Sequence, residues 1–555
     1  ETAMNEKTIK ALEYDKILEM LAQYPASSLG REYAAALRPA AHIDDAKTLL
    51  DQTDEALAVY RRIGRSPVDS FPDILELLQR LPALFSCGAG ELMAIASCLK
   101  ASRTARAALH DDDTGSVLCN MANRLSSHRQ IEEEISRCIL GEDEIADNAS
   151  AELSRIRRQL RLTNERVREK LNSMIKSATT QKYLQEPIIT MRGGRYALPV
   201  KAESRAKVPG LVHDQSSSGA TLFIEPAAVV ELGNEHRRLQ AEEKNEIERI
   251  LASLTAMVAP YADELHMSLV MLGTLDLIFA RALMARDQHA VRPALNEEGE
   301  IHIKAGRHPL LPSDKVVPID LWLGKEQRTL IITGPNTGGK TVTLKTVGLL
   351  TLMAMSGILV PAQEGTALST FDEVYVDIGD EQSIEQSLST FSSHMTNNVR
   401  ILNNASERSL VLLDELGAGT DPVEGAALAQ AILETLYERR ALTLATTHYS
   451  EIKAFALTHA GMQNASMEFD VERLCPTYRL MIGIPGKSNA FEISRRLGLA
   501  PEIIEKAERY LEKQDVAFEA VISEAESARR AAEADRREAQ ELKWEAERLK
   551  TEYER

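Results

Sequence analysis

The sequence predicts a multidomain protein in which an α-helical region with an inserted helical arm is followed by an α/β domain. At 555 residues the chain exceeds one ordinary hydrophobic core, so two to four domains are expected. Residues 4 to about 145 show helical periodicity with few strand signals. From about Val291 onward, apolar strand patterns alternate with helical patterns, which is typical of a largely parallel sheet.

The composition is that of a soluble globular protein, with 44% hydrophobic and 27% charged residues. The net charge of −18 argues against a protein that coats nucleic acid uniformly, but a net charge does not exclude local basic patches. The five cysteines form no C-x-x-C pair, which suits a reducing cytosol and indicates no zinc site. The most apolar run, Val347 to Val360, is too short to span a bilayer. We therefore expect a cytoplasmic location and no membrane partner.

The arm is predicted by two long helices that flank a segment of different texture. From Leu153 the apolar residues are spaced by threes, fours or their sum, as in a coiled-coil seam, and a second such helix runs from about Val229 to Val258. The segment between them holds prolines, glycines and short β-like runs such as YALPV and TLFIE. A helix of about 30 residues extends roughly 45 Å, long enough to reach around a duplex.

The arm is locally basic, with 14 Lys and Arg against 6 Asp and Glu in residues 151 to 215, so the rest of the chain carries a net charge of −26. The functional interpretation is binding of a nucleic-acid backbone by glycine-flanked tip residues. The alternative is a solvated coiled-coil face, which we favour for the arginines of the helices. For the tip we favour nucleic-acid binding, because nothing there needs the charge for folding. The tip residues are Arg192, Arg195, Lys201, Arg205 and Lys207.

A phosphate-binding loop is predicted by ITGPNTGGKT, which matches the pattern G-x-x-x-x-G-K-[ST]. Backbone N–H groups of such a loop surround phosphate oxygens, the lysine adds positive charge and the last hydroxyl faces Mg²⁺. The alternative is a glycine turn with a chance lysine. The flanks argue against it, because RTLIIT reads as a buried strand and the residues after the loop read as a helix. The expected ATP-binding residues are Gly334, Pro335, Asn336, Thr337, Gly338, Gly339, Lys340 and Thr341.

An acidic pair ends the next informative strand, SLVLLDELGAGTD. Asp414 is predicted to hold Mg²⁺ together with Thr341, and Glu415 to orient and deprotonate the attacking water. The alternative is an acidic pair that merely caps a buried strand, which is a weak explanation beside a phosphate loop.

Two further motifs narrow the class of nucleotide site. ALTLATTHYSEI predicts a strand that ends near His448, where the imidazole can sense a γ-phosphate, although alone this histidine would more often be structural. QSLSTFSSHM places Ser389 and Thr390 before a predicted helix, where hydroxyl and N–H groups can contact phosphate; alone they are a helix cap.

Together, GPNTGGKT, STFSSHM, DELGAGTD and ATTHY resemble the MutS family of ABC-type ATPases, and the likeness extends over nearly the whole chain. The helical front, the basic arm, ARHPLL and SNAFEISRRLGL look most like its type-two branch. The resemblance implies ATP and Mg²⁺ as ligands. It also implies a homodimer in which Ser389 and Thr390 of one subunit complete the site of the other.

The family pattern implies five parts for this chain. They are a helical core or lever over 1–145, a clamp arm with a β-rich tip over 146–245, the second part of the lever over 246–290, an ABC-type ATPase domain with dimerisation helices over 291–510, and the start of a charged coiled-coil linker over 511–555. Lys513 to Arg555 carries no helix stop signal, so we expect a longer parent protein. The family implies an endonuclease domain beyond this linker.

One departure concerns mismatch recognition. Mismatch-repair members begin with a domain whose Phe-x-Glu wedge enters DNA, whereas the literal match here, Phe223 to Glu225, lies in the β-like part of the arm. We expect these to be strand residues, and no mismatch recognition.

Two functions remain open at this point. The first is an ATP-dependent dimeric clamp on branched or duplex DNA that suppresses homologous recombination. The second is an ATPase that senses stalled or collided ribosomes, with their rRNA, and splits them into subunits. Both would use the same basic arm, because both targets present duplex-like phosphate surfaces. A chromosome-organising coiled-coil ATPase would need longer arms and an L-S-G-G-Q signature, and the sequence has neither.

Overall fold

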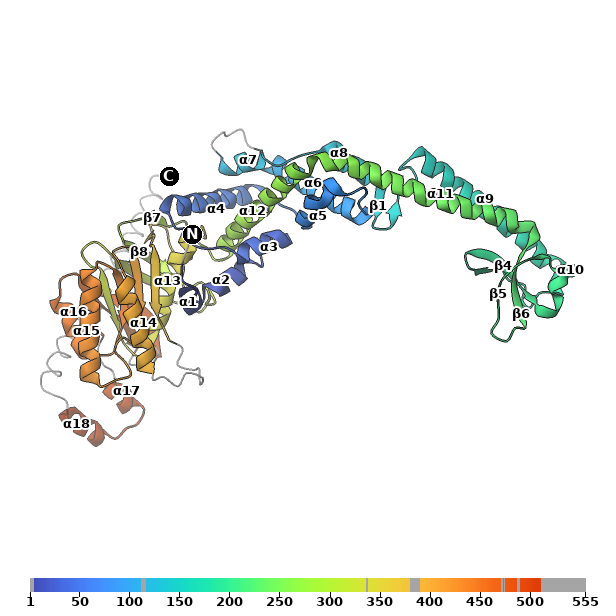
Figure 1. Ribbon diagram of the computed structural model, residues 1–555. Helices are drawn as coiled ribbons and strands as arrows, with labels where there is room; N and C mark the ends of the chain where they lie inside the picture. The colour runs from blue at the N-terminus through green and yellow to red at the C-terminus, as the bar shows by residue number, and fades with distance from the viewer. Residues whose placement is uncertain are drawn as a thin grey trace, which may run out of the picture. The chain divides into compact units, whose positions relative to one another are not determined.

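The computed structural model describes residues 4–110, 116–335, 338–379, 390–470, 473, 475–486 and 490–510 (Figure 1). The chain forms two compact units. The sheet unit comprises Glu1–Pro67, Asp113–Leu118 and Gly273–Arg555, and the arm unit comprises Val68–Asp112 and Cys119–Leu272. The five-part division expected from the sequence stays a prediction.

The sheet unit is built on a six-stranded main sheet with the strand order β12-β13-β14-β10-β15-β16. All neighbouring strands are parallel except β16, which runs antiparallel to β15. Strands β10, β13 and β14 are buried along their whole length, as their unbroken apolar runs predict. The strands are β10 (Thr329–Thr333), β12 (Glu373–Asp377), β13 (Ser409–Leu413), β14 (Leu442–Thr446), β15 (Met462–Asp470) and β16 (Cys475–Ile482).

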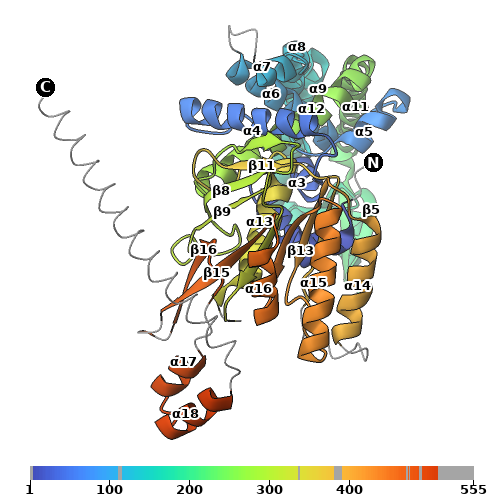
Figure 2. The ribbon, with the colours of Figure 1, turned by 90° about the vertical axis from the view of Figure 1, so that its left-hand side faces the viewer.

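Both faces of the main sheet are covered, because alternate strand residues enter two different cores. Leu330 and Ile332 of β10 pack with α13 (Lys340–Met355), whereas Ile331 packs with the helices of the other face. Those helices are α14 (Thr390–Asn404), α15 (Pro422–Glu438) and α16 (Ser450–Thr458); Figure 2 shows α14 and α15 side by side. The core around α13 also includes a second sheet, β7-β11-β8-β9. Its strands are β7 (Ala294–Asn296), β8 (Ile301–Gly306), β9 (Ile319–Leu323) and β11 (Ala367–Ser369).

N-terminal helices complete the core of the sheet unit. Thr8 donates a hydrogen bond to the Val374 carbonyl (2.7 Å), and Tyr14 donates to the Ser356 hydroxyl (2.6 Å). The remaining helices of this unit are α1 (Glu6–Ala11), α2 (Tyr14–Leu21), α3 (Ser28–Ala35), α4 (Ile43–Ile63), α17 (Ala490–Arg496) and α18 (Pro501–Tyr510).

The arm unit is mainly helical, and its two longest helices pack against each other. Ser150, at the start of α9, hydrogen-bonds Glu246 of α11, and Arg157 pairs with Glu243. The residue numbers of these two pairs increase along α9 and decrease along α11, so the two helices are antiparallel. Their coiled-coil character stays a prediction. The helices are α5 (Leu75–Arg80), η1 (Leu81–Ala83), α6 (Ala89–Leu109), α8 (Arg129–Cys138), α9 (Ala151–Lys176), α10 (Ala178–Gln181), η2 (Ala202–Lys207), α11 (Ala227–Val258) and η3 (Ala259–Tyr261); α7 (Val117–Ala122) and α12 (Ala262–Asp287) begin in one unit and end in the other.

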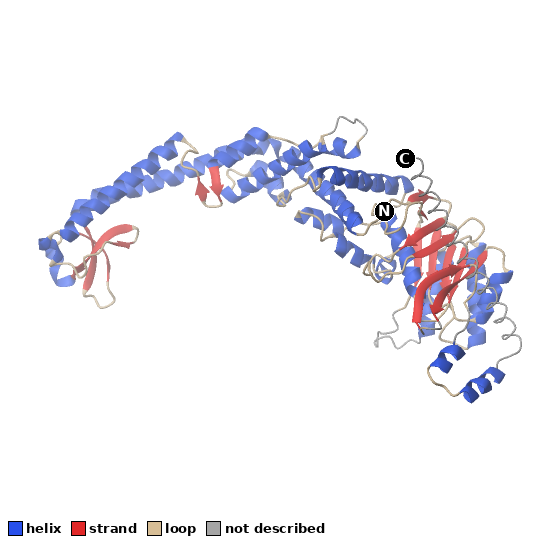
Figure 3. Cartoon of the chain, turned by 180° about the vertical axis from the view of Figure 1, so that it is seen from behind, coloured by secondary structure: helices blue, strands red, loops and turns tan. Residues whose placement is uncertain are grey.

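A four-stranded antiparallel sheet, β3-β4-β6-β5, lies where α9 and α11 meet the predicted β-rich segment (Figure 3). Leu198, Val200 and Ile224 of this sheet pack on Val167 and Val229 of the two helices. Its strands are β3 (Thr190–Arg192), β4 (Arg195–Lys201), β5 (Gly210–Gln215) and β6 (Thr221–Pro226). The expected strand role of the Phe223 to Glu225 segment is thus confirmed.

Two details differ from the sequence expectations. A short hairpin, β1 (Ile139–Gly141) with β2 (Glu144–Ile145), interrupts the region that was expected to be helical. Strands of two and three residues leave no alternating pattern in the sequence. Among the described residues, the helical segment that is long and apolar enough to cross a membrane is Ala227–Asp287, which comprises α11, η3 and α12. It is not the apolar run after Val347. Its most apolar 18-residue window is 67% buried, as in the core helix of a folded domain.

Candidate nucleotide site

Three neighbouring strands bring the predicted motifs to one edge of the main sheet. The order β13-β14-β10 is parallel, with Leu413 beside Ala445 and Thr446 beside Ile332. The carboxyl ends of these strands therefore lie together, and ligands of open α/β sheets bind at such ends. The phosphate loop follows β10, the acidic pair follows β13 and the segment with His448 follows β14.

The phosphate loop has the backbone that its glycines predict. Gly334 and Gly339 have φ angles of 133° and 93°, which side chains other than glycine rarely adopt. The Lys340 ammonium donates a hydrogen bond to the Gly334 carbonyl (2.7 Å) and so crosses the loop. Asn336 and Thr337 lie outside the described residues. The loop opens directly into α13, so the free N–H groups of a helix N-terminus are available to an anion.

Lys340 is a buried positive charge at this edge, with 2% of the residue exposed. Burial lowers the pKa of its ammonium, and the carboxylates of Glu415 and Asp414 oppose that shift. A buried ammonium of this kind attracts phosphate more strongly than an exposed one, because water screens it less.

A chain of hydrogen bonds joins Thr341 to the acidic pair. The Thr341 hydroxyl donates to Asp414 Oδ2 (2.6 Å), and the Thr446 hydroxyl donates to Asp414 Oδ1. One carboxylate and one hydroxyl oxygen, in contact beside a phosphate loop, are the hard oxygen ligands that Mg²⁺ takes while keeping waters and phosphate oxygens as further ligands. The donor set therefore fits this cation.

Glu415 follows Asp414 in a left-handed backbone conformation, φ 48°, which costs a residue other than glycine on the order of 1 kcal/mol. Its N–H donates to the Thr446 hydroxyl (2.8 Å), so the turn is fixed from β14. Within the described part of the chain, the Glu415 carboxylate has no hydrogen bond or ion pair and is partly exposed. A fixed backbone with an uncommitted carboxylate suits a general base.

The other predicted residues of the site are placed to different degrees. His448 is exposed just after β14, and its ring contacts that of Tyr449 at 4.4 Å between centroids. Tyr449 in turn donates to the Gly417 carbonyl (3.0 Å), which ties this segment to the turn after Glu415. Ser389 lies outside the described residues, and Thr390 is the first residue of α14.

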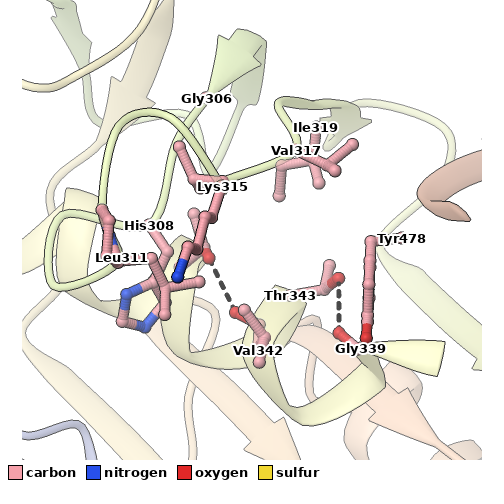
Figure 4. A pocket seen from close by; sticks show the side chains of 13 residues that line it. Gly306, His308, Leu311, Lys315, Val317, Ile319, Gly339, Val342, Thr343 and Tyr478 are labelled. Atoms are coloured by element: carbon pink, nitrogen blue, oxygen red, sulfur yellow. Dashed lines mark hydrogen bonds between the residues drawn. The ribbon is translucent and has the colours of Figure 1, made fainter. Parts of the chain in front are cut away.

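A cavity of about 360 Å³ opens beside the phosphate loop (Figure 4). Its walls come from the β8–β9 connection, the first turns of α13 and β16. Gly339 is shared with the loop, and a Cβ there would lie 3.1 Å from the Tyr478 ring. The lining residues are Gly306, His308, Leu311, Pro312, Lys315, Val316, Val317, Ile319, Gly339, Val342, Thr343, Thr346 and Tyr478.

His308 supplies a neutral polar group to this mostly apolar cavity. Burial lowers the pKa of its imidazole to about 4, so the ring is uncharged near neutral pH. The Leu310 N–H donates to His308 Nδ1 (3.3 Å), which leaves the proton on Nε2. No sequence motif predicts this cavity, because its walls come from three distant segments. The ARHPLL segment was the one local signal of it.

The basic tip residues lie in the arm unit and differ in exposure and in their ion-pair partners. Arg195 is not a free cation: its side chain is 11% exposed, pairs with buried Glu225 (3.1 Å) and donates to Asn234. Its charge supports the fold of the tip, so the expectation that nothing there needs charge for folding is wrong at this position. Arg192 pairs with Asp214 (3.3 Å) and lies over the Phe223 ring. By contrast, Lys201 is partly exposed, and Arg205 and Lys207 are exposed.

Comparison with known proteins agrees with this geometry. Residues 330–515, from β10 onward, match the family model described as MutS domain V. The chain is 52% identical over 529 residues to Endonuclease MutS2 of Alkaliphilus oremlandii, and 51% identical over 529 residues to that of Ruminiclostridium cellulolyticum. It is 49% identical over 530 residues to Endonuclease MutS2 of Clostridioides difficile. Each alignment covers 95% of this chain and 67% of the relative.

The chain belongs to the MutS2 family. The resemblance inferred from four short motifs is thus confirmed, and MutS domain V is a P-loop ATPase-like domain. The likeness to MutS2 proteins also extends through the arm unit, because the alignments cover nearly the whole chain. About a third of each relative has no counterpart in it.

Proposed function

We propose that this chain is an ATP-dependent homodimeric clamp that acts on branched or duplex DNA in the cytoplasm and restrains recombination there. The hydrogen bond between Thr341 and Asp414 carries the proposal, because it joins the phosphate loop to the acidic pair at one edge of the sheet. The MutS2 relatives, named as endonucleases, favour DNA as the target. We assign any endonuclease activity to the part of those relatives that this chain does not match.

In the proposed reaction, loop N–H groups and Lys340 bind the phosphates of ATP. Thr341 and Asp414 would hold Mg²⁺, which neutralises charge on the β- and γ-phosphates when bound. Glu415 then orients a water molecule and takes its proton. His448, which follows the neighbouring strand β14, would sense the γ-phosphate.

The base and ribose of the nucleotide are assigned to the cavity beside Gly339. Its walls are mostly apolar with a few polar groups, as in other small-molecule sites. Tyr478 and the valines 316 and 317 would contact the base, and His308 Nε2 and Lys315 would supply polar contacts.

Dimerisation gives the first testable prediction. Ser389→Ala is expected to bind ATP normally but to form fewer ATP-dependent dimers and to hydrolyse ATP on the order of 10-fold more slowly, because a hydroxyl contact to the partner subunit's phosphate is lost. Light scattering with and without ATP, alongside a turnover assay, measures both. Ser406→Ala, which changes a serine just beyond the C-terminal end of α14, is the matched control. Normal dimers and turnover in Ser389→Ala would remove the trans assignment.

The tip gives the second prediction. Replacing Lys201, Arg205 and Lys207 with alanine should weaken DNA binding on the order of 10- to 100-fold and reduce the salt dependence of binding, while basal ATP hydrolysis stays unchanged. Titration of labelled duplex and four-way-junction DNA at several salt concentrations measures both effects. A variant that loses three exposed cations elsewhere, Lys10, Arg61 and Arg62, controls for net charge. Equal affinity and slope in the two variants would contradict the tip assignment.

The nature of the target is tested by purification from cells in mild salt, followed by sequencing of the bound nucleic acid and identification of accompanying proteins. DNA without ribosomal proteins is the expected result. Ribosomal RNA together with both subunits would replace the DNA assignment by a ribosome-splitting role for the same ATPase.

A further inference from the structure

We propose that His394 and Asn397 of α14 are positioning residues that hold the carboxyl end of β12 against β13 and thereby fix the Asp414 carboxylate for its divalent cation. This inference deepens the proposed function and rests on it. His394 is the histidine of the STFSSHM motif, to which the sequence assigned no role of its own, and Asn397 follows that motif. Among the described residues, neither side chain has a hydrogen bond to the phosphate loop.

The geometry centres on Asp377, the last residue of β12, whose side chain is buried. His394 Nδ1 donates a hydrogen bond to Asp377 Oδ2 (3.0 Å), and Asn397 Nδ2 donates to Oδ1 (2.9 Å). Asn397 also donates to the Val376 carbonyl (2.9 Å). His394 and Asn397 are three positions apart, so one face of α14 presents both donors to the end of the strand.

A backbone hydrogen bond carries this anchoring to the proposed cation ligand. The Asp414 N–H donates to the Asp377 carbonyl (2.9 Å), just beyond the pairing of Asp377 with Leu413. The same Asp414 carboxylate accepts from Thr341. Movement of Asp377 therefore moves the backbone from which the Asp414 side chain extends.

The His394 imidazole is also closely packed against Gly379, two residues beyond the end of β12. A Cβ added to Gly379 would lie 3.0 Å from His394 Cε1 and 3.3 Å from Nε2. Glycine at 379 thus leaves the ring the space in which Nδ1 reaches Asp377. An alanine there would have to displace the ring by a few tenths of an ångström.

Electrostatics favour a cation at this place, because three carboxylates, those of Asp377, Asp414 and Glu415, end adjacent strands. The hydrogen bond to Asp377 raises the pKa of His394 above its ordinary value, against the opposing effect of burial, and the charges of Asp414 and Glu415 add to the rise. Removing a side chain that orients a metal ligand without touching the metal typically changes metal affinity or activity about 10- to 100-fold.

The competing explanation is that His394 only attaches α14 to the sheet. A purely structural anchor would lower stability without changing cation affinity. A positioning residue would change the cation affinity and the protection of the Asp414 amide. The experiment must therefore measure these two quantities as well as melting.

The test compares His394→Ala with the conservative His394→Asn, whose Nδ2 replaces the Nδ1 donor. Mn²⁺ binding to protein loaded with a non-hydrolysable ATP analogue is measured by electron paramagnetic resonance. Hydrogen exchange of the peptide that contains Asp414 is followed in nucleotide-free protein. We expect His394→Ala to bind Mn²⁺ about 10-fold more weakly and to exchange faster at Asp414, and His394→Asn to restore both.

Two further variants keep the test decisive. Gly379→Ala should reproduce the weaker Mn²⁺ binding to a smaller extent, and it serves if His394→Ala fails to fold. His459→Ala removes a histidine that faces Glu434 from the end of α16, and it should change neither quantity. If the wild-type protein binds neither nucleotide nor Mn²⁺, the proposed function fails. If the wild type binds both, and the variants at positions 394 and 379 bind Mn²⁺ as tightly as the wild type, this inference alone is overturned.

Discussion

Glu415→Gln is expected to bind ATP with near-normal affinity and to hydrolyse it at least about 100-fold more slowly, the usual contribution of a positioned general base. The amide keeps the size of the side chain and the turn that Thr446 fixes through the Glu415 N–H. It removes the proton acceptor. Single-turnover hydrolysis of radiolabelled ATP, alongside equilibrium binding of a fluorescent nucleotide, separates the two effects.

The matched control for this variant is Glu424→Gln, which removes an exposed carboxylate in the first turn of α15. That variant should hydrolyse ATP at the parental rate. Normal turnover in Glu415→Gln would transfer the role of base to another group. Loss of nucleotide binding would instead show that the carboxylate shapes the loop. Because the variant traps ATP, it should also accumulate as the dimer if the nucleotide joins two subunits.

The order of elements along the chain was predictable because long elements bury long regular patterns. The buried strand of five residues before the phosphate loop and the helix after it leave unbroken apolar runs in the sequence, and the two long arm helices leave apolar residues at helical spacing. The β1–β2 hairpin was not predicted, since its two- and three-residue strands are shorter than any period. The strand order could not be predicted from the sequence either, because β10 pairs with β14 and β15, which follow it by more than 100 residues.

Residues of a candidate site can be predicted from the sequence where chemistry demands a contiguous motif, as in Gly334 to Thr341, whose role in binding ATP stays a prediction. They were not predictable where the fold assembles them from afar. The cavity beside Gly339 needs Tyr478 from β16 and His308 from the β8–β9 connection. The same reason explains the error at Arg195, because its partner Glu225 lies on β6, 30 residues further along the chain. Charge counts report the sign of a segment, whereas pairing decides which cations are free.

Lys340→Met is expected to lower the affinity for ATP about 100-fold, equivalent to about 3 kcal/mol for charge-assisted contacts to phosphate. Methionine keeps much of the buried volume of the side chain, so the loss is mainly one of charge. The hydrogen bond that crosses the loop to the Gly334 carbonyl disappears as well. Isothermal titration with ATP and Mg²⁺, and melting of the nucleotide-free protein, measure affinity and stability separately.

Lys345→Met is the control, since Lys345 lies on the same helix but pairs with Glu13 (2.8 Å) instead of crossing the loop. It should keep the parental affinity for ATP and lose some stability through the broken ion pair. Equal affinities in the two variants would contradict the phosphate role of Lys340. Burial also decides what the variant does to stability. In the nucleotide-free protein, burial lowers the pKa of the Lys340 ammonium despite the attraction of Asp414 and Glu415, and Lys453 adds to the lowering, so the buried charge adds no stability to the fold. Lys340→Met should therefore melt close to the wild-type temperature without nucleotide and gain less stability from ATP than the wild type does.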